Sequence, residues 1–91
     1  MNNRAIVTVL GSDRAGIVAA VAGVLAERNA NILDITQTIL QGIFTMTMLV
    51  DLGEGEVDFA GIQGQLEDLA DQLHVQIQMQ REDVFKYMYR L

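Results

Sequence analysis

A short segment with a glycine at each end, Gly-Ser-Asp-Arg-Ala-Gly at residues 11–16, is the part of the chain best suited to bind a ligand. An apolar run at residues 5–10 precedes it, and an amphipathic run that begins at Ile17 follows it. A turn from a strand into a helix leaves the first backbone N–H groups of the helix unbonded, at the positive end of its dipole. The segment is therefore predicted to bind a carboxylate or another small anion.

Each residue of this segment also has a structural explanation. Ser12 or Asp13 can cap the following helix, and such a cap contributes about 0.5–2 kcal/mol to stability. The residue that does not cap the helix can contact a ligand's ammonium group. Because the Asp13 carboxylate repels a ligand carboxylate, backbone N–H groups near Ala15 and Gly16 are the better donors. Gly16 either allows close packing or keeps the surface open. The positive charge of Arg14 is unfavourable near the positive end of the helix dipole. Exposure to solvent, an acidic partner or a bound anion relieves this repulsion.

The composition excludes several classes of function. The 91 residues suffice for one compact domain, and a hydrophobic fraction of 51% is typical of a folded one. Without cysteine, neither a disulfide nor a thiolate metal site can form, so we expect no metal and no cofactor. The net charge of −6, with scattered acids, argues against nucleic-acid binding.

The location expected from the sequence is the cytoplasm. No apolar run approaches the roughly 20 residues that a bilayer-spanning helix needs, so no membrane partner is expected. The start of the chain, residues 1–4, leads directly into a predicted strand and lacks the form of a signal peptide.

The chain shows little that could catalyse a reaction. A single histidine, His74, lies near a predicted helix end, and Ser12 has no base close to it in sequence. No glycine-rich phosphate loop followed by lysine is present. The acids Glu67, Asp68 and Asp71 share a solvated helix face. We therefore expect that the protein is not an enzyme.

Hydrophobic periodicity predicts four strands and two helices. In order, they are a strand at 4–10, a helix at 14–29, strands at 31–41 and 43–52, a helix from about Asp58 to Leu73, and a strand at 75–80. The first strand is apolar throughout, which indicates burial on both faces and a central position. The turn signal Gln41-Gly42 predicts that the second and third strands form a hairpin.

This order predicts an α+β, ferredoxin-like βαββαβ fold, with a four-stranded antiparallel sheet and both helices on one face. The strands at 4–10 and 43–52 take the central positions, and the other sheet face is left without a helix. A tail at 82–91 follows. If it is helical, its apolar residues share one side, and we expect it to dock on its own domain or on a partner subunit. Tyr87 and Tyr89 would then serve as anchors.

Two segments, 7–18 and 25–32, resemble the ACT domain, a small regulatory module that binds amino acids and related ligands. The family usually shows Asp-Arg-Pro-Gly after its first strand, where this chain has Asp13-Arg14-Ala15-Gly16. It also shows an Asn-Ile pair at the start of its second strand, here Asn31-Ile32. Alanine supports a first helical turn well, so the missing proline leaves the expected fold unchanged. The resemblance covers residues 1–81.

The tail sequence looks like that of a free-standing bacterial subgroup of the family. Its nearer relatives look like the ACT modules of the glycine cleavage system repressor and of formyltetrahydrofolate deformylase. The resemblance implies a homodimer that binds an amino acid or a similar small carboxylate at its interface and acts through a regulated partner protein. The alternative is a structural protein–protein interaction module with no small ligand.

The resemblance also implies which residues contact the ligand. One copy contributes the segment after its first strand, and the neighbouring copy contributes the start of its second strand. Asn31 has a further explanation as a turn residue between helix and strand. The candidate ligand-binding residues are therefore Gly11, Ser12, Asp13, Arg14, Ala15, Gly16, Asn31 and Ile32.

Overall fold

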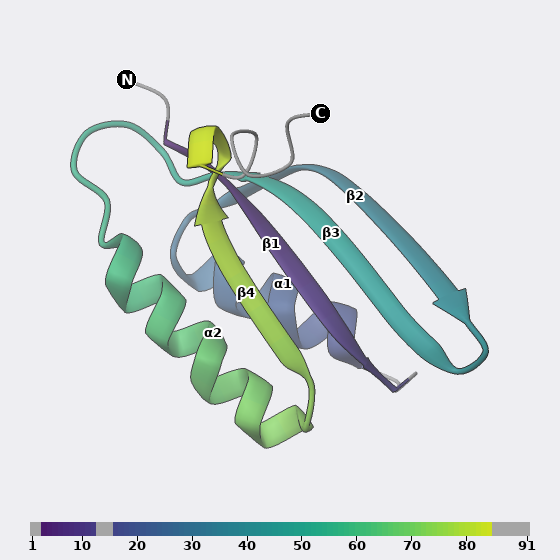
Figure 1. The fold of residues 1–91 in the computed structure, drawn as a ribbon. Coiled ribbons are helices and arrows are strands. Elements are labelled where there is room, and N and C mark those ends of the chain that lie inside the picture. The colour runs from purple at the N-terminus through teal and green to yellow at the C-terminus, as the bar shows by residue number, and fades with distance from the viewer. Residues whose placement is uncertain (1–2, 13–15, 85–91) are drawn as a thin grey trace.

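The structure, a computed structural model, describes residues 3–12 and 16–84. Its elements are β1 (Arg4–Ser12), α1 (Ile17–Glu27), β2 (Asn31–Leu40), β3 (Ile43–Asp51), α2 (Phe59–Leu73) and β4 (Gln76–Arg81). The strands form one antiparallel sheet in the order β2-β3-β1-β4, and both helices cover the same face (Figure 1). The predicted ferredoxin-like βαββαβ fold, with 4–10 and 43–52 in the centre, is confirmed.

β1 is central but is buried on one face only. Ala5, Val7 and Val9 are fully buried and point toward the helices, whereas Thr8 is half-buried and Leu10 is exposed on the other face. The prediction that both faces of this strand are buried is therefore wrong. Its physical reason is the topology, because both crossover helices return to the same side of the sheet and leave the opposite side without one.

The core lies between the sheet and the helices. β3 contributes alternate residues from Phe44 to Val50, as the sequence pattern predicts, and β1 contributes Val7 and Val9. The helices add residues at helical spacing: Ile17, Val21 and Leu25 from α1, and Ile62, Leu66 and Ala70 from α2. This amphipathic spacing forces one side of each helix onto the sheet.

α2 begins at a side-chain cap, as predicted. Asp58 is the N-cap residue, and its Oδ1 accepts a hydrogen bond from the Gly61 backbone N–H at 3.1 Å. A Cβ on Gly61 would collide with the Asp58 carboxylate, whereas a Cβ on Gly64, one turn later, would meet open space. The two helical glycines therefore have different structural roles.

We expect Gly61→Ala to destabilise the protein by about 1–2 kcal/mol, because the new methyl group displaces the capping carboxylate. Gly64→Ala serves as the matched control and should stabilise it by about 0.5–1 kcal/mol, since alanine favours a helix interior. Urea unfolding of both variants at one protein concentration measures the difference. Equal effects of the same sign would contradict the assigned roles.

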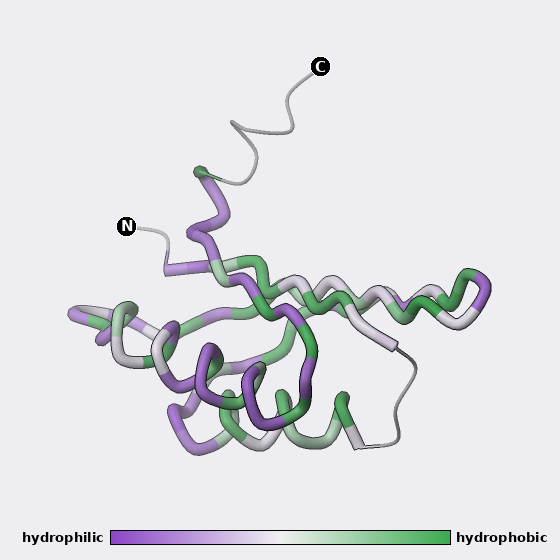
Figure 2. The backbone as a smooth tube through the Cα atoms, turned by 60° about the horizontal axis from the view of Figure 1, so that its bottom comes forward, coloured by the Kyte–Doolittle hydropathy of each residue, from purple (hydrophilic) through white to green (hydrophobic). Residues whose placement is uncertain are grey.

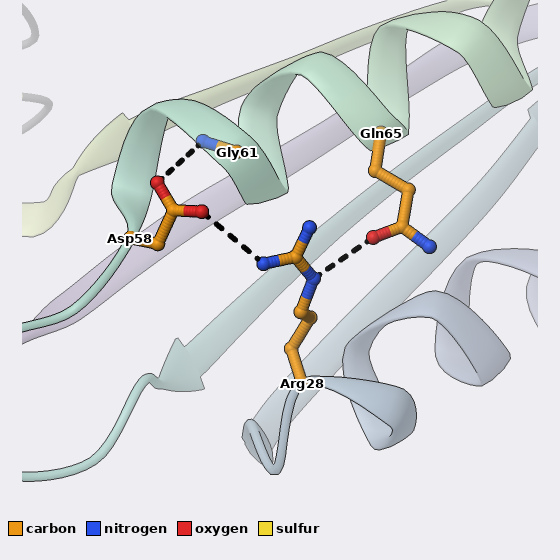
Figure 3. A network of polar contacts seen from close by, with 4 residues as sticks. All are labelled: Arg28, Asp58, Gly61 and Gln65. Atoms are coloured by element: carbon orange, nitrogen blue, oxygen red, sulfur yellow. Dashed lines mark hydrogen bonds and ion pairs between the residues drawn. The ribbon is translucent and has the colours of Figure 1, made fainter.

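A polar network that the sequence did not predict joins the end of α1 to the start of α2 (Figure 3). Arg28 Nε donates a hydrogen bond to Gln65 Oε1 at 2.9 Å, and Arg28 Nη1 forms an ion pair with Asp58 Oδ2 at 3.4 Å. The chain then reverses at Asn29, whose φ of 59° matches its predicted role in a left-handed helix end. The network thus fixes the two helices relative to each other on the sheet.

The described start of the tail is attached to β1. Residues 82–84 form a helical turn, and the Glu82 carboxylate, 7% exposed, lies 2.8 Å from Arg4 Nη2. Because the Arg4 side chain is 39% exposed, loss of Arg4 would be the costlier change, since it removes a cation from beside the buried Glu82 carboxylate. The remainder of the predicted tail, and with it the anchoring role of Tyr87 and Tyr89, lies outside the described residues.

Candidate functional site

The candidate segment 11–16 connects the end of β1 to the start of α1. Gly11 and Ser12 are the last residues of β1, and Gly16 is the N-cap residue of α1. Asp13, Arg14 and Ala15 lie outside the described residues. The segment therefore occupies the expected position between a strand and a helix N-terminus.

Gly16, the N-cap residue of α1, has no side chain with which to cap the helix. Its φ is 88°, in the left-handed region that favours glycine, and it makes no side-chain cap hydrogen bond. The backbone N–H of Ala20 donates to the Gly16 carbonyl at 2.9 Å, which is the first hydrogen bond of the helix. The N–H groups of Ile17 to Ala19 thus have no acceptor within the helix, and no acidic side chain stands in the first turn.

Ser12, one of the two residues predicted to cap α1, does not occupy the N-cap position. Ser12 remains in β1, where it pairs with Ile43, and the N-cap position belongs to Gly16 instead. A glycine takes this position because the chain turns with a positive φ there. The alternative capping residue, Asp13, lies outside the described residues.

Gly11 is explained by packing. A Cβ at this position would lie 2.5 Å from Val75 Cγ1, closer than real Cβ atoms approach. By contrast, a Cβ on Gly16 would meet no atom within 4 Å among the described residues beyond its chain neighbours. Of the two glycines, Gly16 is therefore the one that keeps the surface open beside the helix N-terminus.

Asn31 and Ile32 lie at the opposite end of the sheet from this segment. They pair with Asp51 and Val50 at the end of β3, whereas Ser12 pairs with Ile43 at its beginning (Figure 1). At about 3.3 Å per residue, the length of β3 separates the two groups by roughly 26 Å. One chain therefore does not bring the two parts of the candidate site together.

The exposed edge of the sheet offers a way to join them. β2 is an edge strand, and most of its residues are exposed. If a second copy aligned its β2 antiparallel to this one, its Asn31 would lie near Leu40. That is the end of the sheet at which β1 leads into α1. Such an alignment would bring Asn31 of one copy to the end of the sheet that carries the 11–16 segment of the other.

The described residues hold two further polar features, His74 and a hollow beside α2. His74 is the C-cap residue of α2 with a φ of 57°, which confirms its predicted place at a helix end. A shallow hollow between α2 and β4 is lined by side chains that include Gln63, Glu67 and Gln78. Within residues 3–12 and 16–84, no group of three or more histidines or acids could hold a metal ion.

Comparison of sequences gives matches over nearly the whole chain. The sequence profile of the ACT domain matches residues 3–80. A UPF0237 protein of Methanocaldococcus jannaschii is 53% identical over 89 residues, which cover 98% of this chain and 99% of the relative. Over the part of the chain that the structure describes, no helix is long and apolar enough to cross a membrane.

Comparison of structures agrees. An ACT domain protein from Streptococcus pneumoniae superimposes with a TM-score of 0.81 and 41% identity, and the match covers 94% of this chain and 97% of that one. A formyltetrahydrofolate deformylase from Burkholderia mallei superimposes with a TM-score of 0.76 at 17% identity, over 87% of this chain and 28% of that one. A protein assigned to the glycine cleavage system transcriptional repressors gives 0.76 at 22% identity, over 88% and 46%. These last two likenesses concern the fold alone.

Proposed function

The chain belongs to the ACT domain family, and on this premise we propose that it senses an amino acid or a similar small carboxylate and regulates a partner protein. ACT domains are generally regulatory modules that bind small molecules. The observation that carries the proposal is the start of α1. There Gly16 leaves the surface open, and the N–H groups of Ile17 to Ala19 have no helical acceptor.

The proposed site lies between two copies of the chain. One copy provides the 11–16 segment, in which Asp13, Arg14 and Ala15 complete the set that contacts the ligand. Asn31 and Ile32 come from the β2 edge of the second copy. The exposed edge and the opposite placement of the two groups support this arrangement. Bound ligand would stabilise the dimer by contacting both chains.

The proposed module regulates without catalysing a reaction and works in the cytoplasm without a cofactor, a nucleic-acid partner or a membrane partner. Its output is a change in the dimer that a regulated protein detects. A ligand can produce such a change only by binding one state of the dimer more tightly than another.

A thermal-shift screen of the full chain against the amino acids, at millimolar concentrations, tests this function. A ligand present at ten times its Kd adds about 1.4 kcal/mol to the free energy of unfolding. For a domain of this size, that raises the Tm by about 6–11 °C. We expect a subset of amino acids to give such a shift, and the corresponding amino alcohols, which lack the carboxylate, to give none.

The alternative function, an interaction module with no small ligand, predicts a different result. A second candidate is warranted because Ile39, Leu40 and Ile43 are exposed at the tip of the β2–β3 hairpin. If folded, dimeric protein responds to no amino acid or other small carboxylate, the sensing function is contradicted. The hairpin tip would then be the first surface to alter in a search for a protein partner.

A further inference from the structure

β4 forms one of the two edges of the sheet, and among the described strands it pairs only with β1. The turn at 41–42 has a positive φ at both residues, as in a type I′ turn, so Leu40 and Ile43 form a hydrogen-bonded pair. Hydrogen-bonded and non-bonded pairs alternate along an antiparallel ladder. Following this alternation through β3 and β1 directs the backbone N–H and C=O groups of Ile77 and Met79 away from β1, toward the outer edge.

One side chain already takes the place of a neighbouring strand at this edge. Gln63 of α2 reaches β4, where its Nε2 donates a hydrogen bond to the Met79 carbonyl at 2.9 Å. In a wider sheet, a backbone N–H of the next strand would occupy that position. The contact also agrees with the outward direction that the register gives to Met79. Outward backbone groups such as those of Ile77 are a template for pairing with another chain.

A groove runs beside this edge, between α2 and β4, which lie next to each other in the fold (Figure 1). Two adjoining hollows form the groove, and they share Glu67, Ile77 and Gln78. The buried side chains of Leu66 and Ala70 contribute apolar surface to it. A strand that added to β4 would therefore also lie along α2, as extended peptides do when they join the edge of a sheet beside a pocket.

The wall that α2 contributes to this groove is acidic. Glu67 and Asp71 line it, and both are exposed. None of the described residues that line the two hollows is basic, and α2 has no lysine or arginine between its ends. Figure 2 shows α2 with hydrophilic stretches in purple, where most of α1 is hydrophobic and green. The groove therefore attracts a positively charged segment.

The spacing of the two carboxylates matches the repeat of a strand. Glu67 and Asp71 are four residues apart on one side of the helix, which places them about 6 Å apart along its axis. Alternate residues of a strand point to the same face and lie about 6.6–6.8 Å apart. Two basic side chains at alternate positions can thus each meet one carboxylate. The β2 edge offers no such wall, because α1 contains no acidic residue before Glu27.

We propose that the β4 edge binds an extended segment of a partner protein that carries lysine or arginine at alternate positions. The backbone of the segment pairs with Ile77 and replaces Gln63 at the Met79 carbonyl. Its basic side chains meet Glu67 and Asp71. This inference rests on the proposed function for the existence of a regulated partner, and it names the surface and the chemistry by which that partner docks. Because the proposed ligand site uses the β2 edge, ligand and partner can bind at the same time.

A titration of the full, isotope-labelled chain followed by NMR tests this docking. The probe is a short peptide in which threonine and lysine alternate. The amide signals of Ile77 and Met79 should shift to saturation, and Glu67→Gln and Asp71→Asn should each raise Kd about two- to fivefold. Asp68→Asn is the matched control, since it removes the same charge from an exposed α2 residue that lines neither hollow. It should leave Kd nearly unchanged.

The same peptide with N-methylated backbone amides keeps its charge but cannot pair with a strand, so it should not bind. Equal binding of the two peptides would overturn the docking. So would equal effects of Asp68→Asn and Glu67→Gln, or the absence of any shift at Ile77 and Met79. The amino-acid screen is run on the same protein. Amino-acid binding without peptide binding refutes the docking alone, whereas peptide binding without an amino-acid response supports the docking and contradicts the sensing function.

Discussion

Replacing Gly16 with aspartate is expected to abolish binding of the small carboxylate. The new carboxylate would stand at the N-terminus of α1. There it would accept hydrogen bonds from N–H groups of Ile17 to Ala19, which have no acceptor within the helix, and repel a negatively charged ligand. Aspartate tolerates the left-handed backbone better than most residues, so the fold should persist. Isothermal titration with an amino acid found in the thermal screen measures the loss, which we expect to exceed 100-fold in Kd.

The chain offers a closely matched control for this variant. Gly55, in the loop between β3 and α2, has a φ of 78° against 88° for Gly16, and a Cβ on either glycine would meet no described atom within 4 Å beyond its chain neighbours. Gly55→Asp thus introduces the same side chain at another positive φ, beyond the end of β3 opposite the one that pairs with Ser12. Its ligand affinity should equal that of the wild type. Equal losses in the two variants would assign the effect to stability rather than to the site.

Mixing variants then determines whether the site is shared between copies. Asn31→Ala should weaken binding about tenfold, corresponding to one lost hydrogen bond. In dimers refolded from equal amounts of Gly16→Asp and Asn31→Ala chains, half are mixed, and each mixed dimer has one intact site. About a quarter of the wild-type sites should therefore return with wild-type affinity. No return of tight sites would show that both residues act within one chain. Wild-type affinity of the Asn31→Ala protein by itself would show that Asn31 plays no part.

Met46→Ala is expected to destabilise the domain by about 2–5 kcal/mol. Met46 is fully buried in β3, a central strand of the sheet, and belongs to the core between the sheet and the helices. Its truncation leaves a cavity that the flanking strands cannot close. Because small domains have only about 5–15 kcal/mol of total stability, this change removes a large part of it. Urea unfolding at a fixed protein concentration gives the difference.

Met46→Leu is the control for this loss. It keeps the volume and the apolar character, so its cost should stay below about 1.5 kcal/mol. A similar loss in both variants would indicate that the shape of methionine, rather than the filled volume, matters at this position. Full stability of the alanine variant would contradict the central place of Met46 in the core.

The secondary structure and the fold could be predicted from the sequence because local patterns and topology rules carry them. The alternation of Phe44, Met46 and Met48 with threonines locates β3 and its buried face. Asp58 marks the start of α2, and Asn29 marks the turn after α1. The burial of β1 could not be predicted in the same way. A run of apolar residues is compatible with two buried faces, and only the position of the helices decides which face stays open.

The candidate site was predictable in position but not in detail. The strand-to-helix turn at 11–16 and the remote placement of Asn31 follow from the order of the elements. The use of Gly16 rather than Ser12 as N-cap depends on the path of the backbone, which residue types alone do not determine. The contacts between Arg28 and Asp58 and between Arg4 and Glu82 join residues far apart in sequence, and no local pattern indicates such pairs.

The central position of β1 also has a consequence for the speed of folding. Val9 pairs with Met46 on one side and with Ile77 on the other, so this strand gains its neighbours only after long loops of chain have closed. Loop closure of this kind costs entropy before any contact forms, and proteins rich in distant contacts fold in milliseconds to seconds. The β2–β3 hairpin needs no such closure. It is the part of the sheet that we expect to form first and to serve as the template on which β1, and then β4, assemble.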